Sequence, residues 1–404
     1  MMEVSFAIFR KQEGEERLSM SELSLPSQFE SFGDARKQGF IAVKNLKEQG
    51  KKVAGVFCTY APQELILAAG AVPIGLCAFS DETIPDAEKV LPRNLCPLVK
   101  SSYGFAITEK CPYMYFSDLM IGETTCDGKK KMYELLGKIK NMHVMQLPQN
   151  QTDEISKELW YQEVLRLKAR IEQDFGVTIT DEDIRAAIKT KNEERKVLKE
   201  FYELSKACPP PITGSEQLKV LYGSQFKFDQ ETKIREIREI IEKIKADQEK
   251  GVQNVSPSAK RILITGCPLA GVTEKVVKAI EESGGVVVAY ENCIGIKPVE
   301  RLVDETMDDP YRAIADRYLQ IGCSVMTPNN NRFELLSRLV KEFKVDGVVE
   351  MTLQACHTYN LETAQIRELM QKEDVPFISI ETDYSTSDVA QLKTRLAAFI
   401  EMLP

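Results

Sequence analysis

Residues 51–77 read KKVAGVFCTYAPQELILAAGAVPIGLC. The apolar run over residues 53–57 predicts a buried strand, residues 61–71 predict a helix just after it, and residues 72–77 predict a second strand. Pro62 stands near the first helical turn, where a proline is tolerated because its missing N–H would have no helical partner there. A strand, a helix and a strand in succession predict a βαβ unit with parallel strands.

The same alternation continues along two parts of the chain. Before residue 150, further helices are predicted at 34–49, 96–109 and 127–140, and further strands at 115–125 and 143–148. After residue 259, strands at 261–266, 285–291, 346–352 and 375–381 alternate with helices at 271–284, 331–344, 361–373 and 388–403. Strands that alternate with helices at this spacing predict an α/β fold with parallel sheets.

The middle of the chain has a different character. Residues 152–251 are helix-forming and highly charged, and Ser, Thr or Asp opens the first helical runs, as N-caps do. We therefore predict four segments, which are a loosely ordered lead over 1–33, a first α/β domain over 34–150, a helical insert or connector over 151–258, and a second α/β domain over 259–404.

Composition excludes several classes of protein. A net charge of −8 over 404 residues lacks the basic footprint of a nucleic-acid-binding protein. No apolar run reaches the roughly 18–20 residues that span a bilayer, and no signal peptide is recognised. A cytoplasmic location is therefore expected, and in a reduced cytoplasm clustered cysteines bind metal or do redox work more often than they form disulfides.

Six of the ten cysteines stand at, or just beyond, the ends of predicted strands or in the turns that follow. They are Cys58, Cys96, Cys126, Cys267, Cys293 and Cys356. Ligands of open α/β sheets bind at the carboxyl ends of the strands. Two sets of thiols at such edges predict one large metal centre shared by two similar halves. Cys323, which follows a helix and precedes a turn, is a seventh candidate.

Two plainer interpretations remain open for these thiols. A buried free cysteine packs like a small hydrophobe, which fits Cys77 and Cys208 well and Cys111 moderately. A zinc site usually shows a local CxxC pair, and the sequence contains none. Thiols that come from separate strand ends favour an iron–sulfur centre.

Other candidate residues carry weaker signals. Glu64, Glu123, Glu291, Glu350 and Glu381 stand near strand ends and could deliver protons, although exposed or capping carboxylates are the commoner case. We take Glu64, Glu350 and His357 as the catalytic candidates. The lysine run 129–131 is either a solvated face or a docking surface for a partner. Neither a P-loop nor a GxGxxG dinucleotide motif occurs in the sequence.

Four segments resemble the 2-hydroxyacyl-CoA dehydratase and benzoyl-CoA reductase family. They are FCTYAPQELILAAGAVPIGLC, LPRNLCPLVKSSYG, GETTCDGKKKMYELL and MTLQACHTYNLE, and the resemblance extends from about Gly39 to Leu403. It implies two Rossmann-like domains and a four-iron cluster held by Cys96, Cys126 and Cys356.

The remaining candidate cysteines make the chain similar to the double-cubane cluster protein branch of that family. Cys58, Cys267, Cys293 and Cys323 lie in segments similar to that branch, in which six cysteines hold an [Fe8S9] centre. The similarity implies a cytoplasmic, homodimeric reductase of a small molecule. A separate homodimeric [4Fe-4S] activator would hydrolyse ATP and supply its electrons. A 2-hydroxyacyl-CoA dehydratase subunit with one [4Fe-4S] cluster, and a non-catalytic electron-storage module, remain as alternatives.

Overall fold

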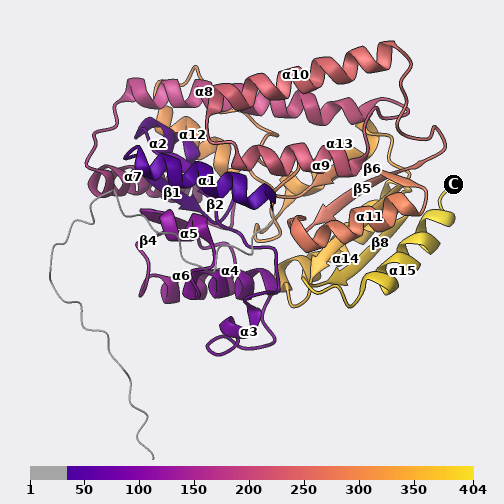
Figure 1. Cartoon of the computed structure of the whole chain (residues 1–404), viewed down its shortest axis with the longest axis horizontal. Helices are drawn as coiled ribbons and strands as arrows, with labels where there is room; N and C mark the ends of the chain where they lie inside the picture. Colours follow the sequence, from indigo (N-terminus) through magenta and orange to yellow (C-terminus); the bar gives the residue numbers. More distant parts are fainter. Residues whose placement is uncertain (1–33) are drawn as a thin grey trace, which may run out of the picture.

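The computed structural model describes residues 34–404, and the predicted lead over residues 1–33 lies outside that part. It contains two four-stranded parallel sheets, with strand orders β2-β1-β3-β4 and β6-β5-β7-β8 (Figure 1). The α/β fold class with two Rossmann-like, parallel-sheet units is therefore confirmed. The two sheets have the same strand order. In each, the second strand along the chain is an edge strand that pairs with one side of the first strand. The third strand pairs with the other side of the first, and the fourth pairs with the third.

The first sheet is built within residues 53–145. Its strands are β1 (Val53–Val56), β2 (Val72–Gly75), β3 (Leu119–Glu123) and β4 (Met142–Met145). Its helices are α1 (Asp34–Glu48), α2 (Gln63–Ala68), α3 (Ile84–Ala87), α4 (Pro97–Ile107), α5 (Pro112–Phe116) and α6 (Asp127–Leu136). Every residue of β1 and β3 is buried, as expected of parallel strands covered on both faces.

The second sheet is built within residues 260–382. Its strands are β5 (Lys260–Gly266), β6 (Gly285–Glu291), β7 (Gly347–Leu353) and β8 (Phe377–Thr382). Its helices are α11 (Lys275–Glu282), α13 (Asn330–Glu342), α14 (His357–Lys372) and α15 (Val389–Glu401), while α12 (Pro310–Leu319) lies between β6 and α13 in the chain but packs elsewhere.

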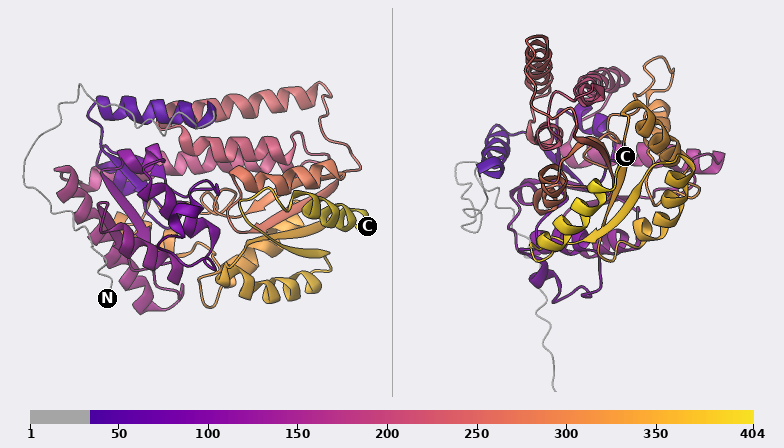
Figure 2. Two further views of the ribbon diagram at one scale, coloured as in Figure 1. Left: turned by 60° about the horizontal axis from the view of Figure 1, so that its bottom comes forward. Right: turned by 90° about the vertical axis from the view of Figure 1, so that its right-hand side faces the viewer.

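The helical insert consists of α7 (Glu154–Phe175), α8 (Asp181–Glu203), α9 (Gly214–Gly223) and α10 (Gln230–Glu249). Thr180 and Asp183 form a capping box that begins α8, as the sequence suggested. The insert extends along one side of both sheets (Figure 2). Ile184 and Ile188 of α8 join the core of the first sheet, while Phe201 and Tyr202 join the core of the second. One long helix thus ties the two domains together.

Helix α12 lies within the predicted second domain over 259–404 but packs away from the second sheet. Its apolar side chains, such as Ile314 and Leu319, pack in one core with β1 and β3 of the first sheet and with α7 of the insert. The chain therefore crosses back to the first domain between residues 303 and 326, because the amphipathic α12 finds its apolar partner on α7. This crossing brings Cys323 to the first sheet.

One local prediction also changes. Residues 115–125 were expected to form one strand, but Pro112 stands at the first turn of α5, so the segment divides into that helix and β3. Within the insert, Thr213 and Glu216 cap the start of α9 reciprocally. Within residues 34–404, no helix is both long enough and apolar enough to cross a membrane.

Candidate metal centre

The candidate cysteines follow the strands that flank the reversal point of each sheet. Cys58 follows β1 and Cys126 follows β3, while Cys267 follows β5 and Cys356 follows β7. In each sheet, the connection after the first strand leads to one edge and the connection after the third strand leads to the other edge. A crevice therefore opens between the carboxyl ends of these two strands. The topology therefore delivers one pair of thiols to each crevice.

The structure brings four thiols into a first set, the Cys356 group, which comprises Cys96, Cys126, Cys267 and Cys356. The thiols of Cys267 and Cys96 donate hydrogen bonds to Cys356, and these bonds hold the pKa of Cys356 well below its usual range. Cys126 lies close enough to Cys356 for their charges to interact. This group combines cysteines from both sheets.

Three members of the Cys356 group occupy the same structural position. Cys96, Cys126 and Cys356 are the N-cap residues of α4, α6 and α14. These sulfurs accept no capping hydrogen bond, but backbone N–H groups of the first helical turns lie near enough to favour the charged form of each thiol and to lower its pKa. N–H donors and the positive end of the helix dipole stabilise a thiolate, which is the form that binds iron.

Three further thiols form a second set, the Cys58 group, which comprises Cys58, Cys293 and Cys323. The Cys58 thiol donates a hydrogen bond to Cys293 and lowers the pKa of Cys293. Cys323 lies near both, because the crossing of α12 carries it to the end of β1. Cys293 follows β6, so this group also needs both halves of the chain.

One cysteine lies in a different set from the one that the resemblance implied. Cys267 was grouped with Cys58, Cys293 and Cys323, but it contacts Cys356 and Cys96 instead. Gly266 explains this position, since its φ of +109° lets the Cys267 amide donate to the carbonyl of Met351 at 2.8 Å. That hydrogen bond turns the end of β5 toward the end of β7.

The donor set fits an iron–sulfur cluster better than a single ion. Over residues 34–404, no group of three or more His, Cys, Asp or Glu side chains could hold one metal ion. A cluster makes a different demand, because each thiolate binds a different iron and the sulfurs need not converge on one point. Seven buried or half-buried soft ligands, three of them at the starts of helices, meet that demand.

Two buried lysines lie near the Cys58 group, and one of them, Lys129, also acts electrostatically on Cys126 of the Cys356 group. Lys129 Nζ donates to the carbonyl of Phe57 at 2.9 Å and lies 3.9 Å from Cys77 Sγ. Lys297 Nζ pairs with Glu291 at 2.8 Å and interacts electrostatically with Cys323 and Cys293. Of the lysine run 129–131, only the second and third side chains are exposed, so the first does not belong to a solvated face.

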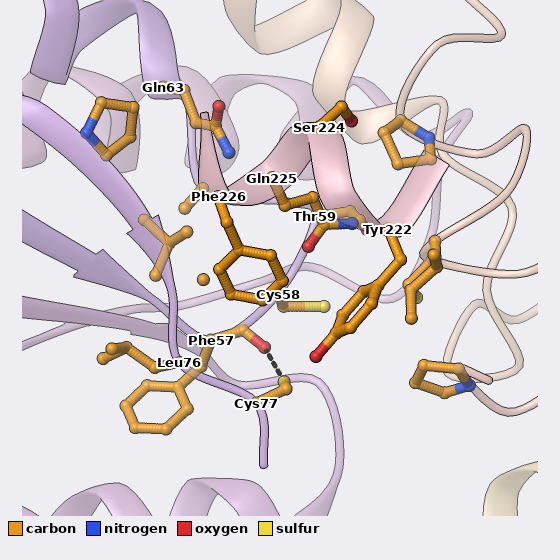
Figure 3. A pocket seen from close by; sticks show the side chains of 18 of the residues that line it. Phe57, Cys58, Thr59, Gln63, Leu76, Cys77, Tyr222, Ser224, Gln225 and Phe226 are labelled. Carbon is orange, nitrogen blue, oxygen red and sulfur yellow. Dashed lines mark hydrogen bonds between the residues drawn. The ribbon is translucent and has the colours of Figure 1, made fainter. Parts of the chain in front are cut away.

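A cavity of about 210 Å³ reaches the Cys58 group from the space between the domains and the insert. Figure 3 shows Cys58 in this cavity with the rings of Phe226 and Tyr222 nearby, and Cys77, which donates to the carbonyl of Phe57 at 2.8 Å. Cys293 also lines it. A small molecule in this cavity would therefore contact the same thiols that the resemblance assigns to the metal centre.

Comparison with known proteins identifies the family. The family model described as 2-hydroxyglutaryl-CoA dehydratase, D-component, matches residues 58–403, which is most of the chain. The chain belongs to the 2-hydroxyglutaryl-CoA dehydratase D-component family. The family-level resemblance is thereby confirmed, whereas the double-cubane branch remains a prediction.

Relatives in this D-component family include dehydratase and reductase subunits. The chain is 55% identical to YjiM of Escherichia coli (strain K12), provisionally named a dehydratase subunit, over 94% of this chain and 98% of that protein. It is 26% identical to the (R)-phenyllactyl-CoA dehydratase beta subunit of Clostridium sporogenes, over 89% and 94% respectively. It is 22% identical to one of the benzoyl-CoA reductase subunits of Thauera aromatica, over 90% and 94%.

The three catalytic candidates lie in different surroundings in this D-component chain. Glu64 is fully buried, accepts from Arg195 Nη2 at 2.6 Å and from the Tyr318 hydroxyl at 2.8 Å, and the neighbouring arginine holds its pKa low against the effect of burial. Glu64 therefore carries no proton to donate at neutral pH. His357 is exposed at the start of α14, and its catalytic role stays a prediction.

Glu350 belongs to a buried ion network in the second domain. Arg332 of α13 is fully buried and contacts Glu291 at 3.2 Å, Glu350 at 3.9 Å and Glu362, with its guanidinium 4.9 Å from the centre of the Tyr359 ring. Burial raises the pKa of Glu350. The network joins the strand before Cys293 to the helix after Cys356, so it fixes the two thiol sets relative to each other.

Arg332→Met is expected to destabilise the chain by about 3–5 kcal/mol, because the change leaves the buried carboxylates of Glu350 and Glu362 without their cation. Urea denaturation followed by circular dichroism would measure the loss. Arg235→Met is the control, since that arginine is 63% exposed beside Glu239 and such surface pairs contribute about 0.5 kcal/mol or less. Equal losses in the two variants would show that the buried network does not stabilise the fold.

Proposed function

We propose that this chain is an iron–sulfur reductase that reduces a small molecule at a double-cubane [Fe8S9] cluster. Its electrons would come from a separate ATP-hydrolysing [4Fe-4S] activator. The proposal rests on one observation, the presence of two thiol sets where a single four-iron cluster of this family would need one. The proposal is more specific than the family assignment, because the family includes both dehydratase and reductase subunits.

The arrangement of the thiols supports a cluster between the domains. Each set contains cysteines from both halves of the chain, so neither domain alone could supply a full set of ligands. Each cubane of an [Fe8S9] centre takes three cysteines. The Cys58 group offers three and the Cys356 group offers four.

The side chains of this protein would hold and tune the cluster. When bound, an iron–sulfur cluster supplies electrons at a potential set by its charge, its hydrogen bonds and its exposure to solvent. Lys129 and Lys297 would offset negative charge at the sulfurs. N–H groups at the starts of α4, α6 and α14 would donate to them, and the apolar cavity walls of Phe57, Leu76 and Phe226 would limit the access of water.

Iron and sulfide content after anaerobic purification tests the proposal. About eight irons per chain are expected, against about four for a dehydratase subunit with one cluster. A colourless protein with no iron would overturn both. The measurement needs no knowledge of the substrate.

The dehydratase subunit remains the second candidate, because curated relatives of this family carry that name. It would use only Cys96, Cys126 and Cys356. A non-catalytic electron-storage module is the third, and the cavity beside Cys58 argues against it, since a storage protein needs no substrate pocket. The activator, the homodimer and the cytoplasmic location remain part of the proposal.

Mixing the chain with such an activator, ATP and a small unsaturated substrate tests the partnership. Substrate reduction that requires all three components is expected. Turnover with a chemical reductant but none with activator and ATP would refute the assigned electron source.

A further inference from the structure

One wall of the cavity beside Cys58 is unusually basic. Lys191 and Arg195 of α8, Lys233 of α10 and Arg317 of α12 all line the cavity and are all buried. The insert, which the sequence predicted to be a connector, supplies three of these four cations. Among the described residues that line the cavity, Glu194 is the only carboxylate.

The buried charges on this wall do not balance. Glu194 pairs with Lys233 at 2.7 Å and also with Lys191, while Glu64, behind the wall, pairs with Arg195. Both carboxyls are ionised, since the neighbouring cations lower their pKa against the effect of burial, that of Glu194 to about 2. Four buried cations thus face two carboxylates, which leaves an excess of two positive charges.

Arg317 carries part of this excess. Its guanidinium donates to the backbone carbonyls of Arg301, at 3.0 Å, and Pro298, and no ion pair joins it to a carboxylate of residues 34–404. Burial lowers the pKa of Arg317 to about 10 and that of Lys191 to about 8. Buried charges are normally matched by opposite charges, so a wall with unmatched cations is suited to an anion.

The same wall also carries N–H donors that make no hydrogen bond within residues 34–404. An ammonium group has three N–H donors. Within residues 34–404, Lys233 Nζ uses one of them, on Glu194, and Lys191 Nζ uses two, on Glu194 and on Gln63 Oε1 at 2.9 Å. Two donors of Lys233 and one of Lys191 remain, on buried side chains that line the cavity. Gln63 itself lies in the pocket view (Figure 3).

Much of the rest of the cavity is apolar, with Lys129 as a further buried cation in its lining, and the cavity is small. Phe57, Leu76, Phe79 and Phe226 form much of its lining on the side of Cys58. Its volume of about 210 Å³ is below the roughly 300–1,000 Å³ of pockets that enclose drug-sized ligands. An occupant therefore combines a short apolar body with one anionic end.

The geometry points to a small organic acid, bound as its free carboxylate by Lys191 and Lys233 with its apolar body toward Cys58, as the ligand of this cavity. The assignment of this acid as a substrate rests on the proposed function, because Cys58 and Cys293 would then hold the cluster beside the apolar body of the acid. The insert would act as the wall that recognises the acid.

Calorimetric titration of the anaerobically purified chain with acrylate tests the inference, with acrylamide as the neutral ligand of the same shape. Acrylate is expected to bind at least tenfold more tightly, equivalent to about 1.4 kcal/mol. Equal affinities would overturn the inference. Inorganic phosphate that binds as tightly as acrylate would also overturn it, in favour of a simple oxyanion site, and tighter binding of acryloyl-CoA would overturn it in favour of a thioester.

Variants of the basic wall give a second measurement. Lys233→Met is expected to remove most of the preference for acrylate over acrylamide, while Lys233→Arg keeps it. Lys245→Met is the control, because Lys245 lies on the same helix but does not line the cavity, and its side chain is 43% exposed and pairs with Glu200. An unchanged preference in a folded Lys233→Met variant would contradict the assignment.

The iron content of the same preparation separates the two proposals. Selective acrylate binding by a chain with about four irons would refute the double-cubane cluster and keep the ligand assignment. A chain with about eight irons that does not discriminate between acrylate and acrylamide would keep the cluster and refute the assignment.

Discussion

Replacing Cys356 by serine is expected to lower the iron content of the anaerobically purified chain from about eight to about four per chain. Cys356 is the centre of its thiol group, since both Cys96 and Cys267 donate hydrogen bonds to it. A serine hydroxyl does not ionise near neutral pH and is a harder ligand than the thiolate that iron–sulfur clusters require. Iron and sulfide analysis, together with the visible absorption spectrum, would measure the change.

The matched variant is Cys58→Ser, which alters the other thiol group. If both groups hold iron, the two variants should lose similar amounts. If only Cys96, Cys126 and Cys356 hold a cluster, Cys58→Ser should keep all of its iron. Cys208→Ser is the control, because Cys208 is exposed and belongs to neither group. Full iron retention in Cys356→Ser would contradict the ligand assignment altogether.

The positions of the strand-end cysteines could be predicted because they depend on local sequence. VAGVFC is an apolar run that ends in a cysteine, and the structure has β1 in that run with Cys58 just beyond it. Likewise, the sequence predicts a helix over residues 96–109, and Cys96 is the N-cap of α4. Periodicity and turn chemistry act over a few residues, so one sequence reveals them.

Which cysteines meet could not be predicted, because that depends on packing between distant segments. Cys323 reaches Cys58 only through the return of α12 to α7, and no local pattern encodes that return. Cys267 reaches Cys356 through the backbone turn at Gly266. The grouping drawn from resemblance therefore differed from the structure at Cys267.

The basic cavity wall could have been predicted from the spacing of its residues, although the composition of the segment suggests a solvated helix. Residues 189–200 are so rich in Lys, Glu and Arg that they suggest a solvated helix. Lys191, Glu194 and Arg195 are nevertheless three and four residues apart, which places them on one helical face with Ile188 and Leu198. Charged residues in register with an apolar stripe indicate a buried polar site rather than a surface.

Gly266→Ala is expected to destabilise the chain by about 2–4 kcal/mol and to reduce its iron content. The φ of Gly266 is +109°, and a Cβ there would lie 2.2 Å from the carbonyl oxygen of Met351. To relieve that contact, β5 and β7 must separate at the point where Cys267 meets Cys356. Urea denaturation and iron analysis of the same preparation would report both effects.

Gly284→Ala isolates the close contact from the cost of the backbone conformation. Gly284 has a similar φ of +90°, but a Cβ there would meet no atom within 4 Å. The Gly284→Ala variant should therefore lose only about 1 kcal/mol of stability, which is the cost of a left-handed backbone for an alanine, and its iron content should not change. The difference between the two variants measures how strongly the turn at Gly266 holds Cys267 against Cys356. If both variants lose stability equally and both keep their iron, the approach of β5 to β7 does not position the thiols.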